Sequence, residues 1–373
     1  MTISNTELLQ LFDAALSADY TRVRRIGSNI SRTLAADDPE AASALKSLIR
    51  RKGIPLQASG YTESLPVDSK SRSPLVEEQP WPTTPLFIEQ ENGAVFRDFI
   101  EDASNAELLT SKGISTRLSL LLSGPPGTGK SLLAGHVAAQ LNKPLYVVRL
   151  DSVVSSFLGD TAKNLRSVFD FIPNRNAVLF LDEMDAVAKV RDDKNELGEL
   201  KRVVNTLIQG LDSLDDRSII IGATNHAQLL DAAIWRRFPY KIELASPSLD
   251  VRIDLWKNFL QIDDSENSNS ILLAKISKGL TGAEIEDISL SARRHALLDN
   301  RPVDFSAVAW ASLCLTEGKS VMPERNGLNT ETKKKLALYL SQHAHVSGAD
   351  VARFLGITRQ AVSAYLKDER YGN

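Results

Sequence analysis

Residues 118–141, LSLLLS-GPPGTGKS-LLAGHVAAQL, carry the strongest indication of the fold in this sequence. A short apolar run leads into eight residues rich in glycine, and an apolar helical pattern opens directly after them. Glycines in such a loop let backbone N–H groups turn inward, where the N-terminus of the following helix adds a favourable dipole for an anion. This order of strand, glycine-rich loop and helix predicts a phosphate-binding loop.

The loop supplies the first candidate ligand-binding residues. Lys130 is long enough to reach the β- and γ-phosphates of a nucleotide, and the Ser131 hydroxyl is a ligand for Mg²⁺. The other loop residues, which we expect to contact phosphate mainly through their backbone, are Gly124, Pro125, Pro126, Gly127, Thr128 and Gly129. A chance glycine-rich turn is the alternative, but the flanking strand and helix patterns argue against it.

Polar residues end two later apolar runs and are candidates for the same site. Asp182 and Glu183 close the run AVLFLD-E, and Asn225 closes the run SIIIGATN. Beside a phosphate loop, Asp182 is expected to hold Mg²⁺ through water, and Glu183 to polarise the attacking water. Asn225 is expected to position that water, and Asp185 to support the site. A solvated acidic strand end is the alternative for the two carboxylates.

Five short apolar runs alternate with helical patterns in the middle of the chain. Runs of this kind are typical of buried parallel strands, because helices on both faces of a sheet erase the polar–apolar alternation. They lie at residues 118–123, 144–150, 177–182, 218–224 and 240–244. The pattern predicts an α/β fold with a parallel five-stranded sheet.

Composition shifts divide the chain into six predicted segments. The stretch 53–85 holds six of the fifteen prolines together with many serines, so it predicts a linker. After Pro247 the pattern is wholly helical to about Leu315. The predicted segments are a helical N-terminal domain (1–52), a linker (53–85), a large α/β subdomain (86–246), a helical subdomain (247–315), a second linker (316–332) and a helical C-terminal domain (333–373).

Overall composition excludes several classes of protein. With 44 Lys and Arg against 47 Asp and Glu, the chain carries a net charge of −3, which excludes a protein that coats DNA with a wholly basic surface. The single cysteine, Cys314, excludes an intramolecular disulfide and a multi-cysteine zinc site. No apolar run approaches the ~20 residues of a membrane-spanning helix, so we expect a cytoplasmic protein without membrane contact.

Four motifs in order resemble those of an AAA+ ATPase. They are GPPGTGKS, LFLDEMDAV, GATN and LLDAAIWRRFPYKIEL, and the resemblance covers roughly residues 86–315. It is to the AAA branch that includes spastin, katanin and the membrane-anchored AAA proteases. It implies a P-loop NTPase fold with a helical lid at 247–315, hydrolysis of ATP with Mg²⁺, and assembly into a homo-oligomer, expected to be a hexameric ring.

The resemblance also assigns roles to four further residues. Arg236 and Arg237 match the paired arginine fingers, which would stabilise the transferred phosphoryl group in the site of the adjacent subunit. The chain has Arg-Arg-Phe where many members have Arg-Pro-Gly-Arg-Phe, so which arginine contributes more stays open. One of the two could instead form only a salt bridge at the interface. Gly282 and Ala283 are similar to the Gly-Ala that this branch places near the nucleotide.

A candidate protein-gripping loop follows the second strand. Phe157, Leu158 and Gly159 match the aromatic–aliphatic–glycine pore loop of AAA protein unfoldases, in which the ring grips extended polypeptide through apolar contact. The alternative is that Phe157 is a core residue of the following helix. A second charged stretch, residues 189–196, is explained equally well as a pore element or a solvated loop.

The C-terminal residues 348–367 resemble a helix-turn-helix, with Gly356 at the turn. The residues Thr358, Arg359, Gln360 and Ser363 are candidates for DNA binding, because such side chains contact phosphates and base edges. From residue 330 onward there are seven Lys and Arg against four Asp and Glu, a net charge of +3 (7 − 4). That charge is only modestly basic, so a protein-contact bundle stays an alternative.

Two functional hypotheses follow. The first is a ring ATPase that remodels or threads a protein partner, because DNA-gripping rings usually present Lys or Arg at the pore. The second is a DNA-associated ATPase that regulates a nucleoprotein complex. The domain order also resembles ATPases of bacterial two-component modules for toxin–antitoxin or phage-defence roles, in which a separate effector, sometimes a subtilisin-like protease, is controlled. No protease motif is legible in the chain itself, and its five histidines are scattered.

Overall fold

The computed structural model describes most of the 373-residue chain. The described residues are 26–27, 30–31, 42, 65–68, 72–114, 117–154, 158–173, 175–189, 197–215, 217–263, 267–325, 327–344 and 346–371. The chain divides into two compact units, Met1–Leu65 and Pro66–Asn373. The helices predicted for residues 1–52 lie largely outside the described residues. In the described part of the chain, no helix is long and apolar enough to cross a membrane.

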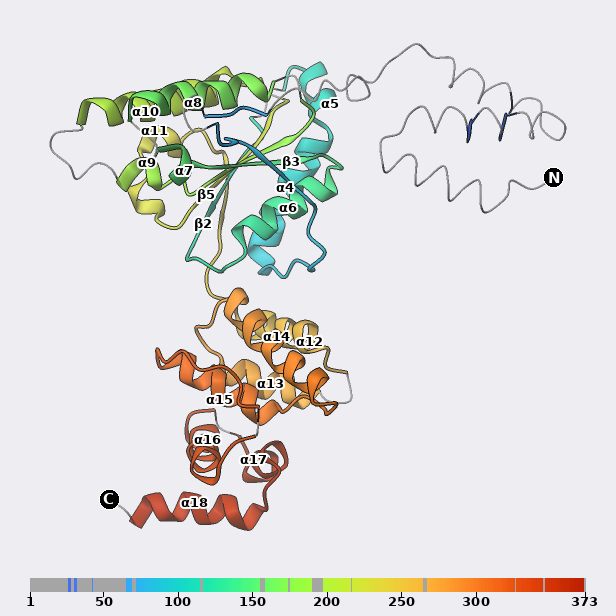
Figure 1. Ribbon diagram of the computed structural model, residues 1–373, viewed down its shortest axis with the longest axis vertical. Helices are drawn as coiled ribbons and strands as arrows, with labels where there is room; N and C mark the ends of the chain where they lie inside the picture. Colours follow the sequence, from blue (N-terminus) through green and yellow to red (C-terminus); the bar gives the residue numbers. More distant parts are fainter. Residues whose placement is uncertain are drawn as a thin grey trace. The chain divides into compact units, whose positions relative to one another are not determined.

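A six-stranded sheet forms the centre of the second unit (Figure 1). The strand order is β1-β3-β4-β5-β2-β6, and every pair is parallel except β1 with β3. The strands are β1 (Glu77–Gln79), β2 (Ser119–Ser123), β3 (Leu145–Arg149), β4 (Val178–Asp182), β5 (Ile219–Thr224) and β6 (Tyr240–Glu243). The predicted α/β class with a parallel sheet is confirmed, and one strand is added to the five predicted.

The additional strand, β1, lies inside the stretch predicted as a linker. It pairs antiparallel with β3, with Glu78 opposite Tyr146. Val76 just before it is fully buried, and the Trp81 indole Nε1 donates a hydrogen bond to Lys143 O at 2.9 Å. All three residues of β1 are polar and exposed, so no apolar pattern marks the strand in the sequence.

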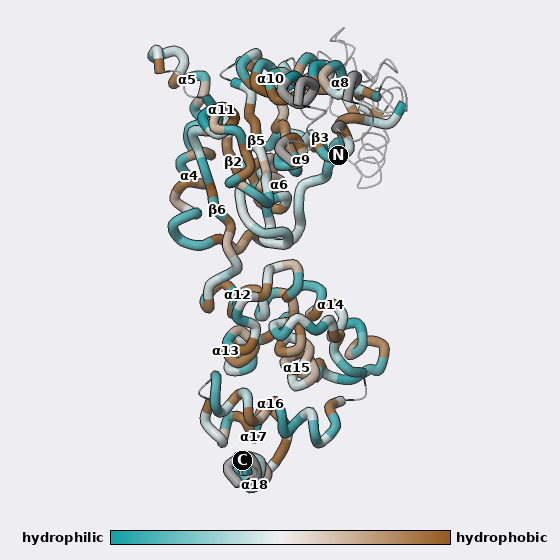
Figure 2. The backbone as a smooth tube through the Cα atoms, turned by 90° about the vertical axis from the view of Figure 1, so that its left-hand side faces the viewer, coloured by the Kyte–Doolittle hydropathy of each residue, from teal (hydrophilic) through white to brown (hydrophobic). Residues whose placement is uncertain are grey.

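Helices cover both faces of the sheet (Figures 1 and 2). Helices α4 (Gln90–Ser104) and α6 (Lys130–Gln140) share a buried cluster with β2 that includes Phe99, Leu133 and Leu120. Helices α8 (Leu158–Phe171) and α10 (Leu197–Ser213) lie side by side on the other face. The other short helices of this part are α5 (Ala106–Ser111), α7 (Leu150–Val154), α9 (Ala186–Lys189), η3 (Ala227–Leu229) and α11 (Ala232–Trp235).

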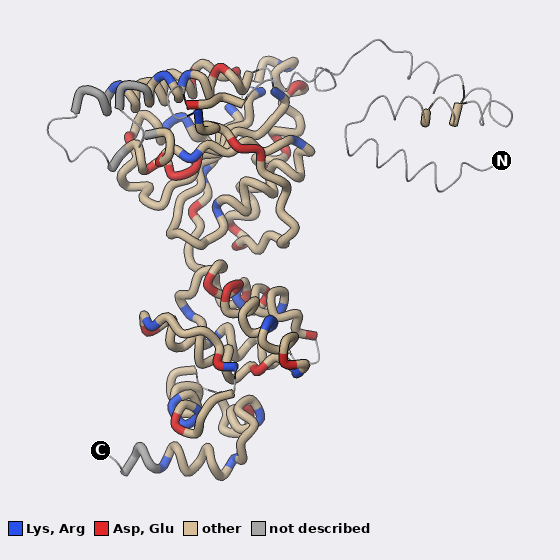
Figure 3. The backbone as a smooth tube through the Cα atoms, in the orientation of Figure 1, with Lys and Arg blue, Asp and Glu red and all other residues tan. Residues whose placement is uncertain are grey.

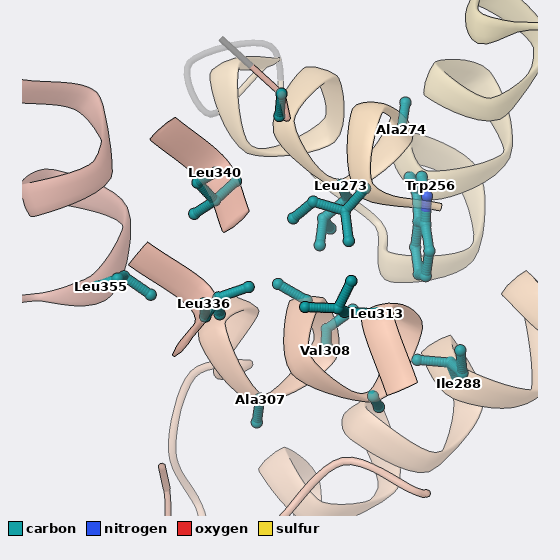
Figure 4. Close-up of a cluster of buried hydrophobic side chains, with 14 of the residues drawn as sticks. Trp256, Leu273, Ala274, Ile288, Ala307, Val308, Leu313, Leu336, Leu340 and Leu355 are labelled. Atoms are coloured by element: carbon teal, nitrogen blue, oxygen red, sulfur yellow. The ribbon is translucent and has the colours of Figure 1, made fainter. Parts of the chain in front are cut away.

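A helical subdomain, called the lid below, follows β6. It consists of α12 (Leu249–Leu260), α13 (Asn267–Ile276), α14 (Gly282–Leu298) and α15 (Phe305–Thr316). Trp256 is fully buried at its centre, near Leu273 and Ile288 (Figure 4), and its Nε1 donates to Ser277 Oγ at 2.9 Å. This pairing satisfies the one polar atom of the largest side chain in the lid core.

The C-terminal helices extend the lid core. They are α16 (Thr330–Gln342), α17 (Gly348–Leu355) and α18 (Arg359–Tyr371), and Leu336, Leu340 and Leu355 belong to the same buried cluster as the lid residues (Figure 4). A tight turn joins α17 to α18 at Gly356, whose φ of +60° suits glycine.

The stretch predicted as the second linker is attached to the lid. Arg325 Nε donates to both carboxylate oxygens of Asp299, at 3.0 and 3.1 Å, and Pro323 is buried. Arg301 also pairs with Asp299 at 3.0 Å. One hydrophobic cluster runs through the lid helices and the C-terminal helices. The boundaries predicted between the lid, this stretch and the C-terminal helices stay predictions.

Candidate nucleotide site

The glycine-rich loop lies where β2 ends and α6 begins. Gly127 and Gly129 have φ values of +77° and +92°, in the left-handed region that glycine adopts without strain. Gly124 approaches the chain closely, since a Cβ there would lie 2.0 Å from Leu244 O. Helix α6 begins at Lys130, so its N-terminal N–H groups face the loop. The predicted strand–loop–helix order is present.

The Lys130 side chain folds back onto the start of the loop. Its ammonium donates to Gly124 O at 2.7 Å and to Pro125 O at 2.8 Å, and the residue is buried. Burial lowers the pKa of Lys130, while the charges of Asp182 and Asp185 raise it in opposition. A phosphate oxygen could replace these carbonyl acceptors without moving the cation out of the loop.

The two carboxylates at the end of β4 face the loop. Burial raises the pKa of Asp182, opposed by a hydrogen bond from Glu183 N to its Oδ1 (2.9 Å) and by the charge of Lys130. Glu183 has a φ of +56°, which is uncommon for a residue with a side chain. Burial also raises the pKa of Glu183, and the neighbouring carboxylates of Asp151 and Asp182 raise it further. Such a carboxyl group is suited to proton transfer.

The end of β5 supplies Asn225. Its backbone N–H and the Thr224 hydroxyl both donate to Asp185 Oδ1 at 3.1 Å, so the buried Asp185 supports this strand end. Asn225 Oδ1 is buried, and among the described residues it has no hydrogen-bond partner. A buried amide oxygen without a partner is costly unless a ligand or water fills the site.

The N-terminus of lid helix α14 closes over the loop. Ala283 N donates to Gly127 O at 3.2 Å, and Gly282 lies beside it. A capping box fixes this helix end: Thr281 N donates to Glu284 Oε2 at 2.7 Å, and Glu284 N donates to Thr281 Oγ1 at 3.3 Å. The N-termini of α6 and α14 therefore meet at the loop, which favours a bound anion.

These groups line a cavity of about 400 Å³. Its polar side holds loop residues 126–131 with Asp182, Glu183, Asn225, Gly282 and Ala283. Its apolar side is formed by Leu86, Phe87 and Ile88 before α4 and by Val251, Leu255 and Phe259 of α12. The apolar side is not predictable from the sequence, because residues 84–89 show neither a helical or strand period nor a motif. A polar end beside an apolar end suits a nucleotide, with phosphates at one end and a base at the other.

The residues present fit Mg²⁺. Ser131 and Asp182 both line the cavity and offer a hydroxyl and a carboxylate, which are hard oxygen donors. In the described part of the chain, no group of three or more His, Cys, Asp or Glu could hold a metal alone. Mg²⁺ at nucleotide sites takes one or two protein ligands together with substrate phosphates, and this donor set matches that habit.

Several predicted site residues lie elsewhere. Arg236 and Arg237 follow α11 and are not among the residues that line the cavity. Phe157 lies outside the described residues, as do residues 190–196 of the second candidate pore element, while Leu158 and Gly159 begin α8. The DNA-binding candidates Thr358, Arg359, Gln360 and Ser363 are all exposed, at the start of α18.

Comparison with known proteins places these features in a family. The ATPase family associated with various cellular activities (AAA) matches residues 120–246. An AAA family ATPase of Sinorhizobium fredii is 32% identical over 283 residues, covering 74% of this chain and 80% of that protein. A proteasome-activating nucleotidase of Methanococcus vannielii is 35% identical over 204 residues, 53% of this chain and 50% of that protein.

A solved structure agrees with these relatives. The crystal structure of the FIGL-1 AAA domain superposes with a TM-score of 0.52 at 21% identity, covering 72% of this chain and 92% of that domain, which shows a shared fold. The chain spans about half the length of the proteasome-activating nucleotidase, but most of the Sinorhizobium protein. The loop, the two strand-end carboxylates and these similarities together show that the chain belongs to the AAA family of ATPases, enzymes that hydrolyse ATP with Mg²⁺ as the partner ion.

Proposed function

We propose that this ATPase works as a cytoplasmic homo-oligomeric ring, a hexamer, that remodels or threads a protein partner. The observation that carries the proposal is the cavity, which combines the phosphate loop with Asp182, Glu183 and the lid contact at Ala283. The relatives support action on a protein partner, because a proteasome-activating nucleotidase is among them.

Five residues that line the cavity have distinct parts in the proposed hydrolysis. Lys130 binds the β- and γ-phosphates by exchanging its carbonyl acceptors for phosphate oxygens. Ser131 and Asp182 would hold Mg²⁺, which would supply positive charge beside the phosphates. Glu183 accepts a proton from the attacking water, and Asn225 orients that water through its unpartnered amide oxygen.

The cations at the cavity support the proposal of a ring. Among the described residues that line the cavity, Lys130 is the one cation, and neither Arg236 nor Arg237 is present. Stabilising the charge of the transferred phosphoryl group takes a further cation in related ATPases, supplied from the same chain or by another. The neighbouring subunit is the source we propose for it.

Threading rests on the segment between β3 and α8. In the sequence, Phe157 directly precedes Leu158 and Gly159, which begin α8. We propose that the aromatic ring of Phe157 grips extended polypeptide. The chain has no legible protease motif, so degradation of the threaded partner would require a separately encoded effector, of which a subtilisin-like protease in a defence module is one form.

The test measures ATP hydrolysis against protein concentration, and release of a trapped partner. Glu183→Gln is expected to trap protein partners in the presence of ATP, and wild type to release them. Phe157→Ala is expected to hydrolyse ATP but not to remodel the partner that Glu183→Gln traps. The matched control Ser156→Ala is expected to hydrolyse ATP and to remodel that partner. A Phe157→Ala protein that remodels the partner normally would refute threading by this loop.

A second function, DNA association, is favoured by the geometry of α17 and α18. The Thr358 hydroxyl, just before α18, accepts a hydrogen bond from Ala361 N at 3.1 Å. The side chains of Thr358, Arg359, Gln360 and Ser363 are all exposed. Lys and Arg lie along both α16 and α18 (Figure 3). Arg359→Ala should weaken binding to duplex DNA and leave ATP hydrolysis unchanged. Wild-type protein that shows no retention on DNA at low salt would refute this function.

A further inference from the structure

The two neighbouring arginines of the finger segment, residues 231–238, differ in what they contact. Arg237 donates through all three guanidinium nitrogens: Nε to Asp212 Oδ1 at 3.2 Å, Nη2 to Asp212 Oδ2 at 2.8 Å, and Nη1 to Ala233 O at 2.7 Å. Arg236 is exposed, and within the described residues its guanidinium has neither a hydrogen bond nor an ion pair. Two residues of the same type, adjacent in sequence, are thus in opposite situations.

Asp212 connects three parts of the fold. It lies near the end of α10, and it also accepts a hydrogen bond from Arg117 Nη1 at 3.1 Å, just before β2. The hydrogen bond from Arg237 and that from Arg117 lower the pKa of Asp212, so the carboxylate stays ionised at neutral pH. Helix α11, helix α10 and the entry to β2 therefore meet at one carboxylate.

Other contacts fix the same segment on both sides of Arg236. Asp231 Oδ1 accepts a hydrogen bond from Ala233 N at 2.8 Å and caps α11. Lys241 Nζ donates to Phe238 O at 2.6 Å and lies 5.3 Å from the centre of the Trp235 ring. These contacts hold the backbone before and after Arg236, while its guanidinium makes no hydrogen bond or ion pair to any residue that the structure describes.

The difference decides which arginine can reach another subunit. To contact a phosphate there, Arg237 would have to release a two-pronged, charge-assisted pair, which is among the stronger hydrogen-bonding arrangements in proteins. Arg236 has no such bond to break. We propose that Arg236 is the arginine finger, and that Arg237 is a positioning residue which holds the finger segment in place through Asp212. This proposal rests on the ring ATPase proposed above.

The test compares four full-length variants by steady-state ATP hydrolysis. Arg236→Ala should lower kcat by about 10³-fold, the loss typical of a removed finger, with KM for ATP unchanged. Arg237→Ala and Asp212→Asn should each lower kcat by about 10- to 100-fold, because a finger displaced by about 1 Å loses that much. The double variant, Arg237→Ala with Asp212→Asn, should have a kcat no lower than that of Arg237→Ala alone, since both changes break the same ion pair.

Three controls separate positioning from loss of folded protein. Asp212→Glu, which keeps a carboxylate, should retain more activity than Asp212→Asn. Asp212→Asn mixed with Glu183→Gln should recover activity, because a mixed interface joins an intact base to an intact finger segment. Glu331→Gln breaks an exposed ion pair with Lys335 (2.9 Å) on α16 and should hydrolyse ATP at the wild-type rate.

Two results would overturn the proposal, and they differ from each other. Arg237→Ala as inactive as Arg236→Ala, with Asp212→Asn near the wild-type rate, would make Arg237 a finger in direct contact with phosphate. A wild-type protein that hydrolyses ATP at its full rate per subunit while it sediments as a monomer would instead exclude the ring, and with it any finger acting between subunits.

Discussion

Replacing Gly127 by alanine should weaken nucleotide binding through the lid. A Cβ at this position would lie 2.9 Å from Thr281 Oγ1 and 3.3 Å from the Cβ of Ala283, both at the start of α14. Gly113 provides a matched control, because it has nearly the same φ (+76° against +77°) and nothing within 4 Å of its Cβ position. Both substitutions carry the same backbone strain, but only Gly127→Ala pushes on the lid.

The expected magnitude follows from those contacts. An L-residue in the left-handed region costs roughly 1–2 kcal/mol, so the free energy of unfolding should fall by a similar amount in both variants. Gly127→Ala should also break the hydrogen bond from Ala283 N to Gly127 O, which is worth about 1 kcal/mol net. Because 1.4 kcal/mol is tenfold in affinity, ATP should bind about fivefold more weakly to Gly127→Ala than to Gly113→Ala.

The assay is titration of each variant with a fluorescent ATP analogue, beside thermal melting. Adding Thr281→Gly to Gly127→Ala should recover part of the affinity, since it removes the nearest atoms while glycine still serves as a helix N-cap. Equal affinities of Gly127→Ala and Gly113→Ala for ATP would show that the contact between Gly127 and the lid does not affect nucleotide binding. So would a loss of affinity that Thr281→Gly leaves unchanged.

Three further predictions concern single residues. Lys130→Ala should lose ATP binding while Glu183→Gln binds ATP without hydrolysing it, and phosphate release by Glu183→Gln near the wild-type rate would contradict that division. Burial raises the pKa of Asp182, so the folded state holds its proton more tightly than the unfolded chain. Asp182→Asn should therefore raise the melting temperature at pH 7, with a gain that shrinks as the pH falls through the folded pKa, and a gain independent of pH would be contrary. Leu340→Ala should lower the free energy of unfolding by about 2–5 kcal/mol, measured by denaturant titration; a separate transition for the C-terminal helices would show that they do not share the lid core.

The sheet and the polar half of the site were predictable because they depend on local pattern. Each of the five apolar runs became a parallel strand, and the carboxyl ends of β2, β4 and β5 lie together because these strands are neighbours. Loop glycines, Asp182 and Asn225 each follow directly from such a strand end. Once the runs are known to be parallel strands, these side chains must meet at one edge of the sheet.

The parts that could not be predicted depend on partners far away in the chain. Strand β1 is polar and exposed, and its place is set by pairing with β3 and by the bond from Trp81 to Lys143, 62 residues further on. Residues 86–88 form one apolar side of the cavity only together with residues of helix α12, which lies far away in the sequence. The continuity of the core from Leu313 to Leu336 crosses a stretch whose composition is that of a linker.

The arginine pair shows the same limit at the level of function. Family resemblance treats Arg236 and Arg237 alike, and nothing in their immediate sequence distinguishes them. The distinguishing partner, Asp212, is 25 residues earlier, and Arg117, which shares its carboxylate, is a further 95 residues back. Because a guanidinium engaged in a two-pronged pair cannot serve another site at the same time, the tertiary partner decides which arginine is free to act. The finger role that we propose for Arg236 thus depends on Asp212, an aspartate that the motif does not contain.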